Sequence, residues 1–491
     1  MAEFETIIKD GMVIDGARTP RYQADIGITN GRIAKIGRLP SSDGAQVLDA
    51  GGLIVAPGVI DLHTHYDAQV FWDPWCSVSS WHGVTSVVIG NCGFGFAPVR
   101  PEARDRAMLT MTRVEAIPFE SMKAGLPWDW VTFPQFLDSL ERQPKGINML
   151  PYVPVAPLLV WVMGLEAAKT RKPTDTEEAE ICRLLDEAME AGGCGWSAQR
   201  NYPGTVAAVQ LDYDGTPMVT DVMADETCVA LARVLGKRNE GFIQLTLFSG
   251  SREHDFAHCE ELARVSGRPV IYNAIVADPR VPNNHRIQIE WLEKCRKKGL
   301  RVYGQGVTGA GGITFSLGDG FNLFDEALPW REATLGSREE VKAKLADPKR
   351  REGLRNAHPK IFVIDLGSIT VVKAYRQDLQ RYENQTLHDI ARGENKHIFD
   401  VLLDISVADD LRTEFFAESF NGKAYFDLLK EIYDYPYLIP GVSDGGAHTK
   451  FFVGAKYPTD MLIDTRDQQM LTLEEAHWRL SALPAWCAGF R

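Results

Sequence analysis

Short apolar runs recur along the chain from about residue 59, and several are followed by a helical pattern that ends at glycine. Strands and helices in alternation are typical of parallel βαβ units. The clearest helix covers about 175–191, where Thr174 and Glu177 have capping-box spacing and Gly192 and Gly193 follow the end. The predicted strands are 59–65, 84–90, 148–154, 193–198, 242–248, 268–275, 300–305 and 437–444.

The order of these elements predicts an α/β fold, a closed (β/α)8 barrel of the TIM type. Further helices are expected at about 224–239, 255–266 and 285–298. Eight strands with helices between them suit barrel closure. A doubly wound open sheet fits the alternation equally well, but no GxGxxG follows an early strand. The candidate chemistry lies at the ends of the first, second and last strands, which converge only in a closed sheet.

The first residues of the chain follow a different pattern. Segments 23–29 and 32–37 alternate apolar and polar residues, and Asn30-Gly31 between them predicts a hairpin with a type I′ turn. We therefore expect a small β-domain ahead of the barrel. The predicted domains are a β-domain at 1–55 and a barrel at 56–491, with an insertion at about 309–400 that covers one mouth of the barrel.

Composition mainly excludes classes of protein. Hydrophobic residues make up 45% and charged residues 24%, as is ordinary for a globular protein. The net charge of −13 argues against nucleic acid and anionic membranes as partners. We expect no membrane span and no secretion signal, because long apolar runs and a basic N-terminal region are absent from the sequence. The eight cysteines lack CxxC spacing, which indicates reduced thiols and a cytoplasmic protein.

His63 and His65 stand two residues apart near the end of the first predicted barrel strand. The period of a strand puts both side chains on one face, where two imidazoles can share one metal ion. Active sites of these barrels lie at the C-terminal ends of the strands. A pair of hydrogen-bonded barrel histidines is the alternative, and the spacing alone does not separate the two.

Three motifs resemble the amidohydrolase superfamily. The run PGVIDLHTHYD at 57–67 resembles its first-strand signature, and the β-rich residues before it resemble its small β-sandwich. The run GVTSVVIGNCG at 83–93 is similar to the second strand of the D-aminoacylase branch, the N-acyl-D-amino-acid deacylases. The run SDGGAH at 443–448 resembles the last-strand motif. The likeness extends over nearly the whole chain and implies a metal-dependent amidohydrolase acting on carbon–nitrogen bonds other than peptide bonds.

The resemblance implies a metal site on His63, His65, Cys92 and Asp444. Neutral imidazoles and a thiolate suit zinc or a similar divalent ion and leave a position open for water. The ion would lower the pKa of that water, and Asp444 would accept its proton as the catalytic base. The plainer alternatives are a buried structural thiol at Cys92 and a helix cap at Asp444.

The sequence also departs from the branch. The branch carries a histidine on strand five and another on strand six, and a lysine after strand six that grips the substrate carboxylate. Residues 241–248 and 269–276 contain no histidine, and Ile275, Val276 and Ala277 stand where that lysine is expected. We therefore expect one divalent ion, and a substrate that is not held by a free carboxylate in the usual way.

Six residues are candidates for binding a small-molecule substrate. Gln244, Asn273 and Gln305 would suit a polar, uncharged substrate, although each is equally compatible with a hydrogen-bonded core amide. Strand four ends in a region where the branch binds substrate, and Arg200 there could anchor an anionic group or form a rim salt bridge. The remaining candidates are Tyr202 and His448.

Two further expectations concern the reaction and the chain end. Deamination, C–C cleavage or decarboxylation on the same scaffold is the rival to amide hydrolysis, and a non-catalytic scaffold protein is a second, weaker rival. The superfamily completes its small β-domain with a segment after the last helix. The chain ends at Arg491 without such a segment, so we expect an incomplete β-domain. Assembly into a homo-oligomer is left open.

Overall fold

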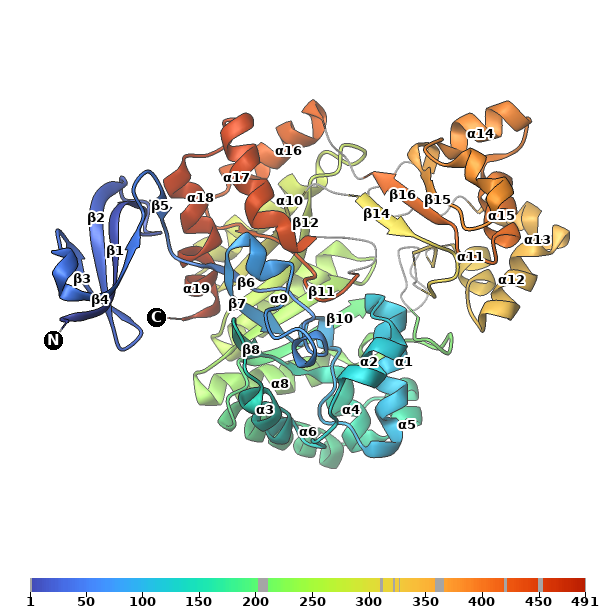
Figure 1. The fold of residues 1–491 in the computed structure, drawn as a ribbon. Helices are drawn as coiled ribbons and strands as arrows, with labels where there is room; N and C mark the ends of the chain where they lie inside the picture. Colours follow the sequence, from blue (N-terminus) through green and yellow to red (C-terminus); the bar gives the residue numbers. More distant parts are fainter. Residues whose placement is uncertain are drawn as a thin grey trace.

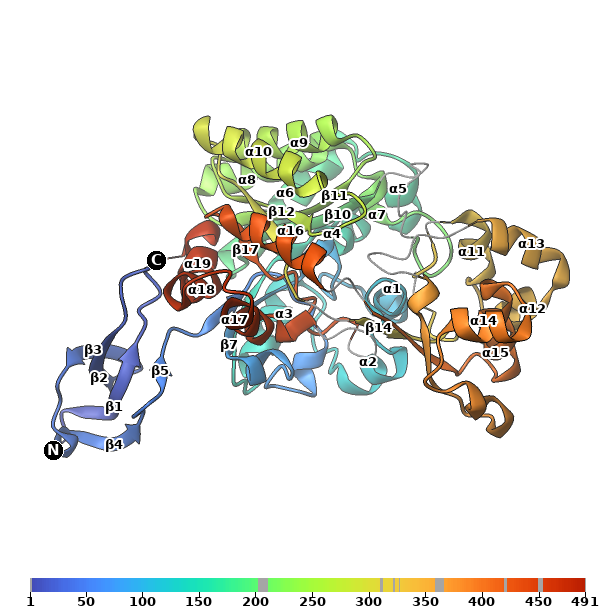
Figure 2. The same ribbon diagram turned by 90° about the horizontal axis from the view of Figure 1, so that it is seen from above.

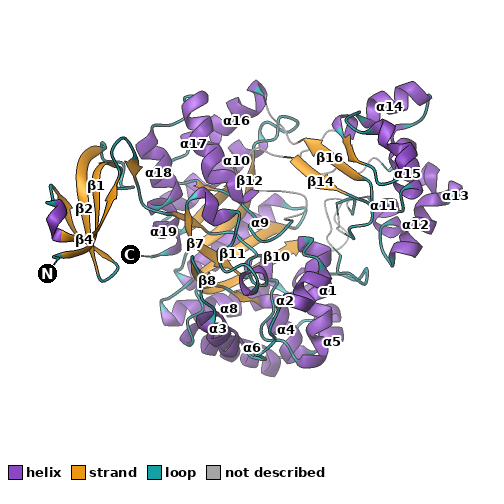
Figure 3. Ribbon diagram, in the orientation of Figure 1, coloured by secondary structure: helices purple, strands orange, loops and turns teal. Residues whose placement is uncertain are grey.

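Eight parallel strands, one of them divided into β8 (Asn148–Pro151) and β9 (Val153–Pro154), form a barrel at the centre of the computed structural model, with helices packed around it (Figures 1 and 3). The structure describes residues 2–201, 211–309, 312–320, 323–325, 327–357, 366–418, 422–448 and 454–490. One sheet contains β6 (Val59–Asp61), β7 (Val84–Ile89) and β8. The other contains β9, β10 (Gly195–Asn201), β11 (Phe242–Phe248), β12 (Val270–Val276), β13 (Val302–Val307) and β17 (Ile439–Pro440).

Two seams close these sheets into a barrel. Strands β8 and β9 follow each other across Tyr152, so one stretch of chain belongs to both sheets. At the other seam, Thr64 and Gly445 form a parallel bridge, and the His65 amide donates to the Gly445 carbonyl at 2.6 Å. The (β/α)8 prediction is confirmed, and the open sheet is excluded.

The helices predicted from capping and periodicity cover the barrel. Helix α6 (Asp175–Glu190) begins with the expected capping box, in which the Glu177 amide donates to Thr174 and the Thr174 amide donates to Glu177. Helix α8 (Asp225–Arg238) lies between β10 and β11 in the chain, α9 (Arg252–Ser266) between β11 and β12, and α10 (Asn284–Lys297) between β12 and β13. The other helices around the barrel are α1 (Arg104–Glu115), α2 (Phe119–Gly125), α3 (Phe133–Arg142), α4 (Val155–Met163), α5 (Leu165–Thr170), α7 (Val219–Val222), α16 (Lys423–Asp434), α17 (Tyr457–Asp467), α18 (Leu473–Leu480) and α19 (Ala482–Ala488).

The N-terminal residues form a five-stranded sheet at one end of the molecule (Figures 1 and 2). The hairpin at its edge has positive φ at both Asn30 (52°) and Gly31 (67°), as a type I′ turn requires. Phe4, Ile7 and Leu39 are its buried apolar cluster. The strands are β1 (Phe4–Val13), β2 (Tyr22–Thr29), β3 (Arg32–Gly37), β4 (Gly44–Asp49) and β5 (Ile54–Val55).

Between β13 and β17 the chain forms a second compact part, here called the inserted unit (residues 312–418). Both ribbon views place it at the opposite end of the barrel from the N-terminal sheet (Figures 1 and 2). It has a separate apolar core that includes Trp330, Phe399 and Phe415. Its elements are β14 (Gly312–Phe315), β15 (Thr370–Lys373), β16 (Glu414–Glu418), α11 (Leu328–Ala333), α12 (Arg338–Ala346), α13 (Pro348–Asn356), α14 (Leu387–Glu394) and α15 (Ile398–Ala408).

The helices in the described part of the chain are too short or too polar to cross a lipid bilayer.

Candidate metal centre

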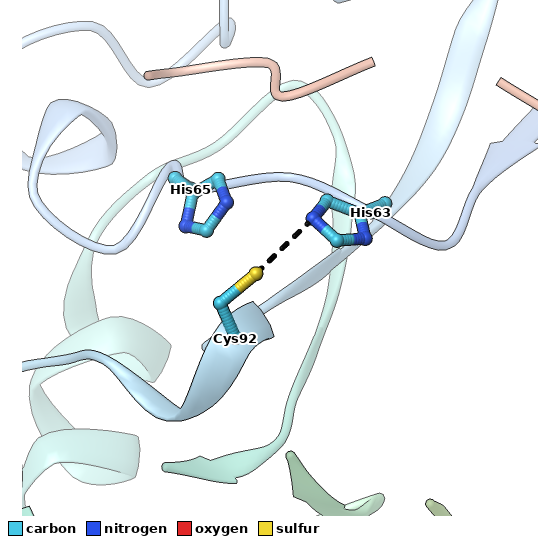
Figure 4. A group of neighbouring side chains, drawn as sticks. All are labelled: His63, His65 and Cys92. Atoms are coloured by element: carbon cyan, nitrogen blue, oxygen red, sulfur yellow. Dashed lines mark hydrogen bonds between the residues drawn. The ribbon is translucent and has the colours of Figure 1, made fainter. Parts of the chain in front are cut away.

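Two histidines and a cysteine converge at the C-terminal ends of the first two barrel strands (Figure 4). His63 and His65 follow β6, and Cys92 lies in a short turn after β7. All three are buried, and their ligand atoms lie within 4.8 Å of one another. Cys92 Sγ is 3.6 Å from His63 Nε2. Three of the four predicted ligands therefore face a common point.

The turn after β7 directs Cys92 toward the histidines. Cys92 has a left-handed backbone (φ 59°, ψ 2°) between Gly90 (φ 77°) and Gly93 (φ 79°). A side chain at Gly93 would put its Cβ 2.8 Å from the Ser197 carbonyl oxygen, so only glycine fits there. A left-handed non-glycine residue is uncommon, and such residues cluster at functional sites. The GNCG sequence thus builds the turn that holds the thiol inside the barrel mouth.

Asp444, the fourth predicted ligand, approaches the same point from the last strand. Its Oδ1 lies 3.2 Å from His63 Nε2 and 3.7 Å from His65 Nε2. The neighbouring Ser443 hydroxyl donates to the His63 carbonyl at 3.0 Å and fastens this loop to the first strand. Donor atoms bound tetrahedrally to one zinc ion are about 3.3–3.6 Å apart. The distances from His63 Nε2 to Cys92 Sγ and from Asp444 Oδ1 to the two histidines therefore fit binding to one shared ion. A combination of nitrogen, sulfur and oxygen donors is also one that zinc accepts.

Electrostatics holds Cys92 and Asp444 in the charged forms that bind metal. Burial disfavours the charged form of each group, but attraction between the imidazoles and the two acids outweighs it. The pKa of Cys92 falls to about 6 beside His63, and the pKa of His63 rises to about 9 beside Cys92 and Asp444. Burial also opposes the charge of Asp444, yet the two imidazoles hold its pKa well below the usual range. Thiolate and carboxylate are the ligating forms, and an arriving cation would displace the imidazole protons.

Two candidate substrate residues lie against the ligands. Gln244 accepts a hydrogen bond from the Cys92 amide at 2.8 Å. The Asn273 amide contacts His63 at Nδ1, the ring nitrogen that does not face Cys92 and Asp444. The contacting atom of Asn273 is its amide nitrogen, and it lies against the side of the ring that leaves Nε2 facing Cys92 and Asp444. The amides on strands five and six therefore support the ligands of strands one and two.

The other candidates have different surroundings. Gln305 donates to the Gly441 carbonyl and ties β13 to the end of β17. Arg200 is buried and pairs with Asp225 at 2.6 Å, which favours the salt-bridge alternative over an anchor for substrate. His448 faces Glu115, at 3.4 Å between Nε2 and Oε2. Tyr202 lies outside the described residues.

Glu115 was not predicted. It ends helix α1, is buried, and has Oε2 3.7 Å from His65 Nε2. Burial raises the pKa of its carboxyl to about 8, although His65 partly opposes this rise. Met108, Met111 and Glu115 lie at helical spacing on one face, and all are buried. A carboxylate in an apolar helical stripe was the signal available in the sequence.

A family model described as the amidohydrolase family matches residues 46–316, more than half of the chain. The chain therefore belongs to the amidohydrolase family. N-acyl-D-aspartate deacylase from Alcaligenes xylosoxydans xylosoxydans is 34% identical over 207 residues, which are 42% of this chain and 39% of the relative. The chain spans about a third to half of the length of the curated relatives that it matches.

Solved structures share the fold of this chain. N-acyl-D-glutamate deacylase from Bordetella bronchiseptica, complexed with zinc and a phosphonate inhibitor, matches with a TM-score of 0.66 and 21% identity. A D-aminoacylase with a binuclear metal centre, described as activated by one metal and attenuated by the second, matches with a TM-score of 0.63 and 20% identity. Each match covers 99% of this chain and 86% of the other chain. The predicted resemblance to the D-aminoacylase branch is confirmed.

Proposed function

We propose that this protein is a metal-dependent hydrolase that cleaves an amide or related C–N bond of a small molecule. The observation that carries the proposal is the convergence of His63, His65 and Cys92 at the C-terminal mouth of the barrel, with Asp444 beside the two histidines. Membership of the amidohydrolase family supports it independently.

The four residues would divide the work of hydrolysis. A bound divalent ion would supply Lewis-acid chemistry, activating water and polarising the substrate carbonyl. His63, His65 and Cys92 offer buried donors that hold their positions. The Asp444 side chain is 26% exposed, whereas those of His63 and His65 are 2% and 1% exposed. Asp444 therefore borders the open side of the site, where it accepts a proton from water and returns it to the leaving nitrogen.

The donor set supports one zinc ion as the cofactor. Thiolate and imidazole together favour zinc over the hard cations magnesium and calcium. Strands five and six offer Gln244 and Asn273, whose amides already contact Cys92 and His63. A one-ion site is compatible with the relative that one metal activates.

We further propose that no lysine or arginine side chain holds the substrate by a free carboxylate. The lysine expected after strand six is absent from the sequence, and Arg200 is paired with Asp225. The eight cysteines are free, which supports a reducing, cytoplasmic setting.

A substrate panel tests the reaction. Chelator-treated protein is reloaded with zinc and offered N-acyl-D-amino acids, N-acyl-L-amino acids, their neutral amides and esters, cyclic amides and carbamates. We expect zinc-dependent release of an amine from the neutral substrates, and loss of that release in Asp444→Asn. Asp464→Asn, outside the site, is the control and keeps the activity. Equal turnover by Asp444→Asn and the native chain would refute the proposed mechanism.

A further inference from the structure

Glu115 is a buried carboxyl group without a lysine or arginine partner among the described residues. It is 4% exposed, and its ion-pair neighbours there are His65 and His448. A buried carboxylate is costly unless it is paired or bound to a metal. Once His65 gives its lone pair to an ion, it is a neutral ligand and no longer balances this charge. The ion at the metal centre is then the cation available to Glu115.

The carboxylate of Glu115 lies beside the nitrogen of His65 that faces the metal centre. Its Oε2 lies 3.7 Å from His65 Nε2, which equals the distance from Asp444 Oδ1 to the same nitrogen. A carboxylate that merely orients a ligand histidine binds the nitrogen remote from the metal. Glu115 instead approaches Nε2, the nitrogen that also faces Asp444.

We propose that Glu115 is a fifth metal-binding residue, which binds the ion from helix α1. The inference rests on the metal centre proposed above and deepens it. Zinc sites expand from four to five donors, so Glu115 can join His63, His65, Cys92 and Asp444 around one ion. An arriving ion would displace the carboxyl proton, and the negative charge that results strengthens the hold on a divalent cation.

The inserted unit fixes Glu115 in this place. Arg113, two residues earlier on α1, binds both carboxylate oxygens of Asp325 at 2.6 and 2.5 Å and donates to the Gly320 carbonyl at 2.7 Å. Ala116, one residue later, is packed in the core of the inserted unit. The His448 amide donates to the Glu115 carbonyl at 2.7 Å. The end of α1 is therefore held from three sides, and the carboxylate is set before an ion arrives.

Zinc affinity tests the inference directly. Glu115→Gln keeps the size of the side chain and removes its charge, and Asp105→Asn makes the same change on the exposed first turn of α1. The dissociation constant is measured by competition with a chromophoric chelator, together with the rise in unfolding temperature caused by zinc. We expect Glu115→Gln to weaken zinc binding at least tenfold and to reduce the zinc-induced rise. Asp105→Asn behaves as the native chain.

The other outcomes distinguish the role of Glu115 from the existence of the metal centre. Native affinity in Glu115→Gln overturns the role of Glu115 and leaves the metal centre intact. Failure of the native chain to bind zinc overturns the metal centre itself. Glu115→Asp, which keeps the charge on a shorter side chain, serves if the glutamine variant does not fold. If the zinc affinity of Glu115→Asp lies between those of the native chain and of a Cys92→Ser variant, the inference is supported. If Glu115→Asp binds zinc as tightly as the native chain, the inference is contradicted.

Discussion

At the residue scale, the site depends on side chains that strand ends bring together. His63, His65, Cys92 and Asp444 could be found from the sequence, because each stands in a motif at the end of an apolar run. The pairing of Arg200 with Asp225 could not, because the two lie on separate elements that meet only in the folded barrel. Chemistry attached to a motif was predictable, and chemistry set by a tertiary partner was not.

Cys92→Ser tests the thiolate ligand. A serine hydroxyl remains neutral near pH 7, so we expect zinc affinity to fall at least tenfold. Cobalt substitution gives a second readout, since the thiolate-to-cobalt charge-transfer band should disappear. Cys182→Ser, at a half-buried thiol on α6, is the matched control and should retain both signals. Retention of the band in Cys92→Ser would show that another sulfur binds the metal.

Asp25 gives a pH-dependent prediction in the N-terminal sheet. Its carboxylate accepts from the Asp10 and Leu39 amides at 2.8 Å and from Lys9 at 2.9 Å. Burial opposes its charge, but these hydrogen bonds lower its pKa to about 2. An unfolded aspartate has a pKa near 3.9, so the carboxylate stabilises the fold above about pH 4, and this contribution is lost as pH falls through 2.

Asp25→Asn should therefore destabilise the N-terminal sheet by about 1–3 kcal/mol at pH 7. The gap between this variant and the native chain should narrow between about pH 4 and pH 2, because the unfolded carboxyl gains its proton near pH 4 and the native carboxyl does so only near its pKa of about 2. Hydrogen exchange of residues 4–55 across this pH range measures the difference. A gap that is unchanged down to pH 2 would contradict the assignment. Asp43→Asn, at a half-buried position in a turn of the same domain, is the control.

At the element scale, local signals predicted most of the barrel. The capping box at Thr174 and the turn at Asn30-Gly31 are formed as expected, because both depend on neighbouring residues alone. The last strand was predicted too long, at 437–444, and the structure shortens it to Ile439–Pro440. Gly441 has φ 77°, and the chain turns there to present Asp444. The apolar pattern therefore continues beyond the residues that form the strand.

Asp325→Asn tests the link between α1 and the inserted unit. Breaking a buried ion pair leaves Arg113 uncompensated and costs about 3–5 kcal/mol. We expect a lower free energy of unfolding and weaker zinc binding, because the end of α1 carries Glu115. Glu332→Gln removes an exposed ion pair with Arg350 in the same unit and should cost under about 1 kcal/mol. If Asp325→Asn bound zinc as tightly as the native chain, the contact between α1 and the inserted unit would have no influence on the metal centre.

At the scale of the whole molecule, the barrel lies between two smaller parts with apolar clusters of their own. Strand order, and hence the barrel, followed from alternation along the chain. The contact between the inserted unit and α1 did not, because it joins residues more than 200 positions apart and has no periodic signature. That contact nevertheless brings an acid into the site. The architecture thus makes the inserted unit part of the structure that supports the metal centre.

The metal content of the purified protein tests the proposed one-ion centre. Protein purified without chelators is analysed for bound metals by mass spectrometry, beside His63→Ala, Asp444→Ala and the control His388→Ala, which lies on α14 of the inserted unit. We expect about one zinc ion per native chain, the same in His388→Ala, and well below one in the two site variants. A native chain that remains metal-free after incubation with zinc, or that holds two ions, would contradict the proposed one-ion centre.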